Sequence, residues 1–360
     1  MTARNRMSLS ELITAEQAIM TLLNAPSSTG FVDVRSEGEW QEGHIEGFHN
    51  QPILNNEERH LVGTCYKQQG NEQATALGYQ LTAAHKPERV ADWAAQANNG
   101  QLIVCCWRGG ARSRIACEWL GEQGIKTLRV QGGYKAMRGF LRERLLNDIP
   151  PLFVLSGETG TGKTLVLQRL NVPVIDLEKL AQHRGSAFGG TGSQPSQQTF
   201  ENRLALEFLR HRHPVVVEDE SRLIGRCEVP APIKQAMYNA PVIVLTASID
   251  ERLQNTFEEY VAEPLRLGHG PEQLHKRLQM ALNKIARRLG GLRHQQLTEA
   301  LSNAFRDPEN AESHRDWIVP LLRDYYDPQY HYAFSQHPRD IRFTGDAAAV
   351  QQFIEQQLFA

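Results

Sequence analysis

Short apolar runs alternate with amphipathic stretches in the first part of the chain. Phe31–Val34, Leu102–Cys105 and Thr127–Val130 are four-residue runs that predict strands, and Arg114–Glu122 and Tyr134–Leu146 are predicted helices. Strands that alternate with helices favour a mainly parallel sheet that is covered on both faces. We therefore predict an α/β domain over residues 9–147.

A second α/β pattern begins after two prolines. Pro150 and Pro151 cannot continue a helix, and Leu152–Leu155 predicts the first strand of a second domain, residues 151–360. A helix over Lys163–Leu170 follows that strand. The remaining predicted strands are Val174–Asp176, Val215–Val217, Val242–Leu245 and Ile341–Phe343.

Helical character dominates the last third of the chain. Asp250 to about Tyr332 is predicted to be largely helical, and Ala347–Leu358 is predicted as a final helix. Gly185–Gln198 is rich in Gly, Ser and Gln, which predicts a long mobile loop. The fold class is thus two α/β domains, the second with a helical C-terminal part.

Composition narrows the class of protein. A chain of 360 residues with 41% hydrophobic and 22% charged residues fits two or three globular domains. We find neither an apolar run of about 18 residues nor a signal peptide, so we expect a cytoplasmic protein without membrane contact. The net charge of −2 means that any RNA contact must come from a local basic patch.

One of the five cysteines lies in a loop suited to sulfur chemistry. The cysteines show neither a CxxC pair nor metal-ligand spacing, so we expect no disulfide framework and no zinc site. Cys106 begins the run Cys-Trp-Arg-Gly-Gly-Ala-Arg-Ser, in which Arg108, Arg112 and the following helix would stabilise a thiolate. Cys105 next to it is expected to face the core. We predict Cys106, Arg108 and Arg112 as catalytic residues.

A phosphate-binding loop follows the first strand of the second domain. Its residues Gly157, Gly162, Lys163 and Thr164 satisfy G-x-x-x-x-G-K-[ST], and Gly160 lies between them. The glycines let backbone N–H groups approach phosphate oxygens, and the lysine supplies a positive charge. We predict that all five residues bind phosphate.

Three other residues are predicted around that loop. Glu218-Asp219-Glu220 follows a predicted strand and could supply a metal-side carboxylate. Within this run we choose Asp219, so Asp219 and Thr164 are the metal ligands that we expect if Mg²⁺ binds. Arg184 precedes the polar loop and Ser186 lies at its start, and both are predicted to close over a phosphate ligand. For Asp219 an alternative interpretation remains open, in which it is a solvated acidic residue at the end of a strand.

Basic residues gather on one predicted helix. They are Lys276, Arg277, Lys284, Arg287 and Arg288. Such a row is suited to tracking an RNA backbone, although a solvated helix face explains it equally well.

The first domain resembles the rhodanese family. The resemblance rests on Asp33–Ser36, Glu39–Trp40, Gly43–Asn50, the cysteine loop and Val130–Tyr134. Rhodaneses carry sulfur or selenium on a loop cysteine as a persulfide or perselenide. Five residues separate Cys106 from Arg112, whereas many rhodaneses have four, and the longer loop is similar to that of rhodanese-fold phosphatases. Such a loop suits a tetrahedral anion, including a phosphate that carries selenium.

The whole chain resembles the tRNA 2-selenouridine synthases. Beyond the two loops, Gly63–Gly70, His183–Gly189, Gln194–Gln197 and Val217–Ser221 carry this resemblance. It implies replacement of sulfur by selenium in 2-thiouridine at the tRNA wobble position, through an S-geranylated intermediate. The implied co-substrates are geranyl diphosphate and selenophosphate, with no tightly bound cofactor, and the implied partners are tRNA and a supplier of selenophosphate. In this scheme the phosphate loop holds the diphosphate and Cys106 delivers selenium.

Two other activities remain open from the residues alone. One is an NTP-dependent sulfurtransferase or kinase that carries a rhodanese domain. The other is a rhodanese-fold phosphatase fused to a nucleotide-binding module.

Overall fold

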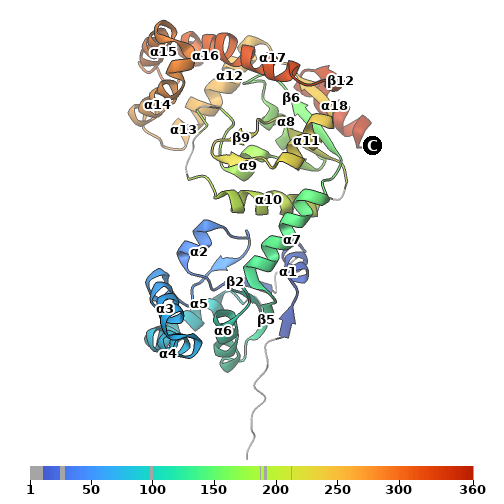
Figure 1. The fold of residues 1–360 in the computed structure, drawn as a ribbon. Helices are drawn as coiled ribbons and strands as arrows, with labels where there is room; N and C mark the ends of the chain where they lie inside the picture. The colour runs from blue at the N-terminus through green and yellow to red at the C-terminus, as the bar shows by residue number, and fades with distance from the viewer. Residues whose placement is uncertain are drawn as a thin grey trace, which may run out of the picture. The chain divides into compact units, whose positions relative to one another are not determined.

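The chain folds into two compact units. The computed structural model describes residues 11–24, 29–97, 100–186, 188–189, 193–211 and 213–359. Met1–Asp148 together with Pro195–Arg210 form the first unit, and Ile149–Gln194 with His211–Ala360 form the second (Figure 1). The first residues of the predicted domain at 9–10 and part of the predicted mobile loop lie outside the described residues.

A parallel sheet forms the centre of the first unit, in the order β1-β5-β4-β2-β3. The strands are β1 (Glu11–Ile13), β2 (Thr29–Asp33), β3 (His49–Asn50), β4 (Gln101–Cys105) and β5 (Lys126–Val130). Asp33 on β2 pairs with Cys105 on β4, so both strands end at the same edge. This edge is where open α/β sheets place their chemistry.

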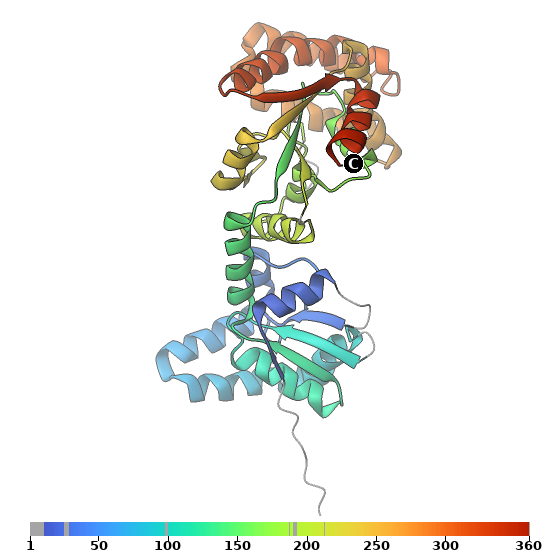
Figure 2. The ribbon, with the colours of Figure 1, turned by 90° about the vertical axis from the view of Figure 1, so that its right-hand side faces the viewer.

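Eight α-helices of the described residues belong to this unit. They are α1 (Ala15–Leu23), α2 (Glu37–Glu42), α3 (Asn56–Gln69), α4 (Asn71–Thr82), α5 (Lys86–Ala95), α6 (Ala111–Glu122), α7 (Gly133–Asn147) and α10 (Gln197–Arg210). Packing of α5 and α6 on the sheet buries a core that contains Trp93, Val104 and Leu120. The helical hairpin of α3 and α4 packs beside it (Figure 2).

The second unit has its own parallel sheet, in the order β12-β11-β6-β8-β7. Its strands are β6 (Leu152–Ser156), β7 (Val174–Ile175), β8 (Val215–Glu218), β11 (Pro241–Leu245) and β12 (Asp340–Gly345). A two-stranded antiparallel hairpin consists of β9 (Leu223–Ile224) and β10 (Cys227–Glu228). The helices around the main sheet are α8 (Lys163–Arg169), α9 (Leu177–Ala181), α11 (Ala231–Asn239) and α18 (Ala347–Phe353).

A helical part with a separate core completes this unit. Its helices are α12 (Ile249–Phe257), α13 (Glu263–Arg266), α14 (Pro271–Leu289), α15 (Gly291–Ala304), α16 (Arg315–Leu321) and α17 (Asp327–Ser335). Leu278, Leu282, Leu301 and Trp317 are buried together in this core. The prediction of two α/β domains with a helical C-terminal part is confirmed. None of the helices in the described ranges is both long and apolar enough to cross a membrane.

Two elements differ from the sequence prediction. Helix α6 begins at Ala111 rather than Arg114, so Arg112 belongs to its first turn. We assigned Pro195–Arg210 to the second domain, but α10 packs on α7 in the first unit. The assignment followed chain order, and no sequence pattern showed that this segment returns to the first unit.

Candidate functional site

The cysteine loop lies against the start of α7. Gly133 has a φ of +58°, and a Cβ atom there would lie 2.1 Å from the carbonyl oxygen of Cys106. That carbonyl accepts a hydrogen bond from the Tyr134 N–H at 2.8 Å, and the Trp107 carbonyl accepts one from the Lys135 N–H at 3.0 Å. Only glycine permits this close approach, which fixes the backbone of the cysteine loop.

The Cys106 thiol is buried at the start of the loop. The residue is 2% exposed, and its Sγ lies 3.2 Å from the Ser113 Oγ in the first turn of α6. Arg112 is within electrostatic reach of this sulfur, whereas Arg108 is exposed. The thiol is thus shielded from solvent but lies near a hydroxyl and a guanidinium. Its role as the selenium carrier stays a prediction.

A carboxylate that the sequence analysis missed holds Arg112. Glu39 on α2 accepts hydrogen bonds from the two terminal nitrogens of Arg112, at 2.5 and 3.0 Å. Burial alone would raise the pKa of Glu39, but the bonds from Arg112 and the Ser36 N–H outweigh burial and lower it. Glu39 belongs to the Glu39-Trp40 pair of the rhodanese resemblance. Its spacing from Ser36 indicates only a capping box at the start of α2, so the contact with Arg112 had no signal in the sequence.

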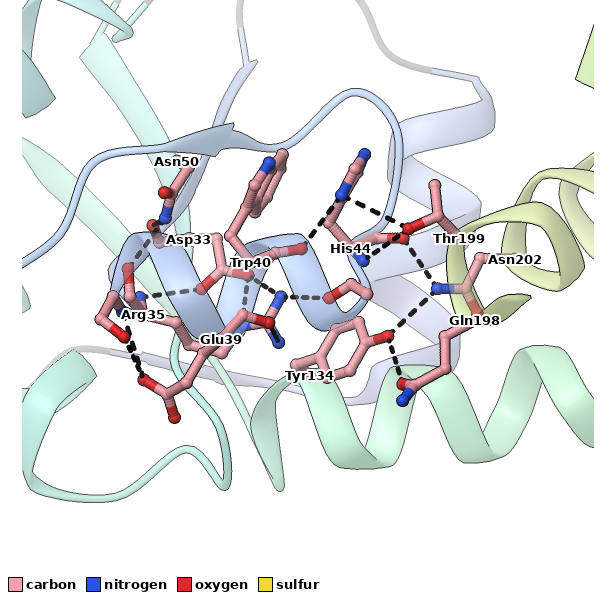
Figure 3. Close-up of polar contacts among 12 residues, drawn as sticks. Asp33, Arg35, Glu39, Trp40, His44, Asn50, Tyr134, Gln198, Thr199 and Asn202 are labelled. Carbon is pink, nitrogen blue, oxygen red and sulfur yellow. Dashed lines mark hydrogen bonds and ion pairs between the residues drawn. The ribbon is translucent and has the colours of Figure 1, made fainter. Parts of the chain in front are cut away.

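Helix α10 supplies polar groups that contact the residues around the loop (Figure 3). The buried Asn202 donates from its amide to the His44 carbonyl oxygen at 2.7 Å, and its Nδ2 lies 3.3 Å from the Tyr134 hydroxyl. Tyr134 in turn donates to Gln198 at 3.1 Å, and its ring lies 3.8 Å from the guanidinium carbon of Arg35. A segment distant in sequence therefore completes the surroundings of the cysteine loop.

A cavity of about 130 Å³ lies beside the same loop. Ala111, Arg112 and Ile115 of α6 line it together with Tyr66 of α3 and Tyr79 of α4. Most of the other lining side chains are apolar. The cavity therefore offers an apolar chain a place next to a guanidinium.

The phosphate loop has the expected strand–loop–helix arrangement. It connects β6 to α8, and Gly160 and Gly162 have φ values of +82° and +85°. Lys163 donates from Nζ to the Gly157 carbonyl oxygen at 2.8 Å. A loop of this kind presents backbone N–H groups and a lysine to phosphate oxygens.

Two residues of α12 brace this loop. Arg252, which is 4% exposed, donates to the Thr159 carbonyl oxygen at 2.9 Å and to the Glu158 carboxylate at 2.6 Å. Asn255 donates to the Gly160 carbonyl oxygen at 2.9 Å. Nothing in the sequence separates these residues from other polar helix positions, so sequence reasoning missed them.

Asp219 has protein partners. Its carboxylate accepts hydrogen bonds from Arg339 at 3.0 and 3.1 Å and from the Ser156 hydroxyl at 2.8 Å. The Lys234 ammonium group lies 3.9 Å away. A carboxylate with these partners is already neutralised, so a metal role for Asp219 has no support from the geometry and stays a prediction.

Arg184 and Ser186 contact the helical part of the second unit. Arg184 pairs with the Glu263 carboxylate at 2.6 Å and donates to the Glu259 carbonyl oxygen at 2.6 Å. The Ser186 hydroxyl lies 2.7 Å from the Tyr260 hydroxyl. These contacts hold the segment after α9 in place, and the predicted phosphate contact of both residues stays a prediction.

Three glutamates, of which Glu218 is buried and Glu178 and Glu220 are half-buried, form an acidic cluster near Lys163. Glu178, Glu218 and Glu220 have carboxylate oxygens within 4.8 Å of one another. Burial, followed by repulsion from Glu220, raises the pKa of Glu178 to about 8. Burial raises the pKa of Glu220 to about 7, although Lys163 opposes the rise. The sequence analysis named Glu218 and Glu220 only as neighbours of Asp219, and it missed Glu178, because the three glutamates meet only in the folded chain.

The five predicted RNA-binding residues all lie on α14. At ~100° per residue, Lys276, Arg277, Lys284, Arg287 and Arg288 span an arc of about 120°. Burial, followed by repulsion from Arg184, lowers the pKa of Arg277, whereas the other four are exposed. The buried leucines of α14 occupy the opposite side of the helix. We call these five residues the basic face; its contact with RNA stays a prediction.

The fold and the two loops define a two-part protein, with a rhodanese-like domain followed by a P-loop domain. Residues 16–139 match the family model of the rhodanese-like domain, and residues 150–359 match that of the tRNA 2-selenouridine synthase AAA domain. The tRNA 2-selenouridine synthase of Hahella chejuensis is 42% identical over 91% of this chain and 91% of its own length. The tRNA 2-selenouridine synthase of Bordetella bronchiseptica is 44% identical over 90% of this chain and 93% of its own length. The chain belongs to the tRNA 2-selenouridine synthase family, as the resemblance indicated.

Proposed function

We propose that this protein replaces the sulfur of 2-thiouridine by selenium at the wobble position of tRNA. The observation that carries the proposal is the presence of an arginine-rich cysteine loop and a phosphate loop in one member of this family. We further propose geranyl diphosphate and selenophosphate as co-substrates, with a supplier of selenophosphate as a partner, in the cytoplasm. The protein would then be a transferase for both the geranyl group and selenium.

The phosphate loop is suited to the first step. The sulfur on C2 of the base attacks C1 of the geranyl group, a C–S bond forms, and the C–O bond to diphosphate breaks. Lys163 and the N–H groups of the loop stabilise the negative charge that develops on the departing diphosphate. The base thereby carries a sulfur that leaves as a thiol rather than as sulfide.

The cysteine loop is suited to the second step. Selenophosphate held in the cysteine loop beside Cys106 forms a Se–C2 bond, the C2–S bond breaks, and geranyl thiol leaves with a proton from solvent. Water then breaks the Se–P bond, so that inorganic phosphate leaves and selenium stays on C2. Arg112, held by Glu39, offers positive charge to a selenium-bearing anion. The cavity beside Arg112 supports the same step, because its mostly apolar lining offers a place for part of the geranyl chain.

Nucleoside mass analysis tests the proposal. Thio-tRNA is incubated with the protein, geranyl diphosphate and selenophosphate, and each component is omitted in turn. Cys106→Ala should abolish selenation and still allow geranylation, whereas Lys163→Ala should block geranylation first. Cys105→Ala is the matched control for the thiol, because Cys105 is fully buried and burial raises its pKa well above the ordinary value.

Selenation by Cys106→Ala at the rate of the unmodified protein would refute the role of Cys106. ATP turnover stimulated by a thiol acceptor, without geranylation of tRNA, would instead favour an NTP-dependent sulfurtransferase or kinase.

A further inference from the structure

We propose that Glu178, Glu218 and Glu220 bind one divalent cation, Mg²⁺ or Mn²⁺, beside Lys163 of the phosphate loop. Glu178 lies on α9, Glu218 ends β8, and Glu220 follows two residues later. Two parallel elements thus bring three carboxylates to the carboxyl-end edge of the sheet, where the phosphate loop also begins.

The spacing of the carboxylates fits a single cation. Their ligand atoms lie within 4.8 Å of one another. Oxygens on opposite sides of a cation are separated by twice the metal–oxygen distance, which is about 4.2 Å for Mg²⁺ and roughly 4.6–5.2 Å for Ca²⁺. The limit of 4.8 Å exceeds the Mg²⁺ value by about 0.6 Å, so one Mg²⁺ can contact all three side chains once they approach one another by up to about that distance.

The state of Glu218 is a second and independent observation. This residue is 1% exposed, and within the described part of the chain neither of its carboxylate oxygens has a hydrogen-bond partner. A buried carboxylate is normally paired, hydrogen-bonded or bound to a metal, because removing its charge from water costs several kcal/mol. An unpartnered carboxylate inside a group of three indicates a missing positive ligand.

The neighbouring cations do not neutralise the cluster. Lys163 interacts electrostatically with all three glutamates, but its Nζ donates to the Gly157 and Glu158 carbonyl oxygens, at 2.8 and 3.4 Å. Lys234 donates to the main-chain oxygen of Glu220 rather than to its carboxylate. A bound divalent cation would displace the protons that burial favours on these glutamates and would balance the negative charge that Lys163 and Lys234 offset only in part.

The cation would have a direct use in the proposed reaction. Beside Lys163 it can contact diphosphate oxygens, which is how P-loop proteins use Mg²⁺. This second statement rests on the proposed function, whereas cation binding by the three glutamates does not.

Titration of the metal-free, full-length protein with Mn²⁺ tests the site, with free Mn²⁺ followed by electron paramagnetic resonance. We expect one Mn²⁺ per chain, displaced by Mg²⁺. Glu218→Gln and Glu220→Gln should each weaken binding by about tenfold or more, since each removes a charged oxygen ligand. Glu272→Gln, at an exposed position of α14, is the matched control and should bind as the unmodified protein does.

Thermal unfolding provides a second measurement. Mn²⁺ should raise the midpoint of the unmodified protein and of Glu272→Gln but not that of Glu218→Gln, whose own fold is checked by circular dichroism. Absence of Mn²⁺ binding by the unmodified protein, or unchanged binding by Glu218→Gln, would overturn the proposal.

Inorganic diphosphate separates this inference from the proposed function. If the cation contacts diphosphate, diphosphate should tighten Mn²⁺ binding to the unmodified protein and not to Lys163→Ala. Mn²⁺ binding without any geranylation activity would leave the cation site intact and count against the proposed function alone.

Discussion

Replacement of Glu39 by glutamine should destabilise the first unit by removing the charge that holds Arg112. The Glu39 side chain is 9% exposed and that of Arg112 is 23% exposed. Breaking a fully buried ion pair by removing one partner costs about 3–5 kcal/mol. Arg112 keeps some contact with water, and the glutamine oxygen still accepts one hydrogen bond. We therefore expect a loss of about 2 kcal/mol in the free energy of unfolding.

Urea unfolding followed by tryptophan fluorescence measures this loss. Four of the five tryptophans lie in the first unit, so the signal reports mainly on that unit. With a slope of about 2 kcal/mol per molar urea, the midpoint should fall by about 1 M. Glu42→Gln is the control, because it makes the same change at an exposed position of the same helix.

The same pair makes a pH prediction. The pKa of Glu39 in the folded protein is below its ordinary value of 4.5, so the unfolded chain binds the proton more tightly. The stabilisation is therefore complete above pH 4.5 and is lost as the pH falls through the lowered pKa. The stability difference between the unmodified protein and Glu39→Gln should be full at pH 7 and shrink in acid. Equal midpoints for Glu39→Gln and Glu42→Gln at pH 7 would refute this reasoning.

Three further predictions follow from single contacts. Gly133→Ala should destabilise the protein by more than about 1 kcal/mol, because its Cβ would meet the Cys106 carbonyl oxygen. Gly139→Ala, in open space within α7, should stabilise it by about 0.5–1 kcal/mol. Thermal unfolding midpoints that shift in the same direction for both variants would contradict this prediction. Asn202→Ala should cost about 1–3 kcal/mol in urea unfolding, since it leaves the His44 carbonyl oxygen without its amide donor; an unchanged midpoint would show that α10 adds no stability there. Arg287→Ala should lower the slope of log affinity for tRNA against log salt concentration by about one, whereas the control Arg306→Ala, also at an exposed position, should leave it unchanged. Identical slopes for the two variants would show that the basic face is a solvated surface that does not contact tRNA.

Local sequence determined much of this protein. The strands at Leu102, Thr127 and Leu152, and both loops that follow strands, were predicted because apolar runs and glycines act within a few residues. The phosphate loop needs only its own spacing, since φ values at Gly160 and Gly162 and the position of Lys163 are local properties. Family resemblance rested on the same short segments.

Only the tertiary structure decided which residues surround the two loops. Glu39 reaches Arg112 across 73 residues, and Asn202 contacts His44 across 158, because adjacent strands and helices bring distant segments to one sheet edge. The three glutamates likewise meet only when the fold brings the side chain of Glu178 to the end of β8. Long-range contacts of this kind leave no periodic signal in a single sequence. Each residue fits the pattern of its own helix or strand, whichever partner it contacts in the folded chain.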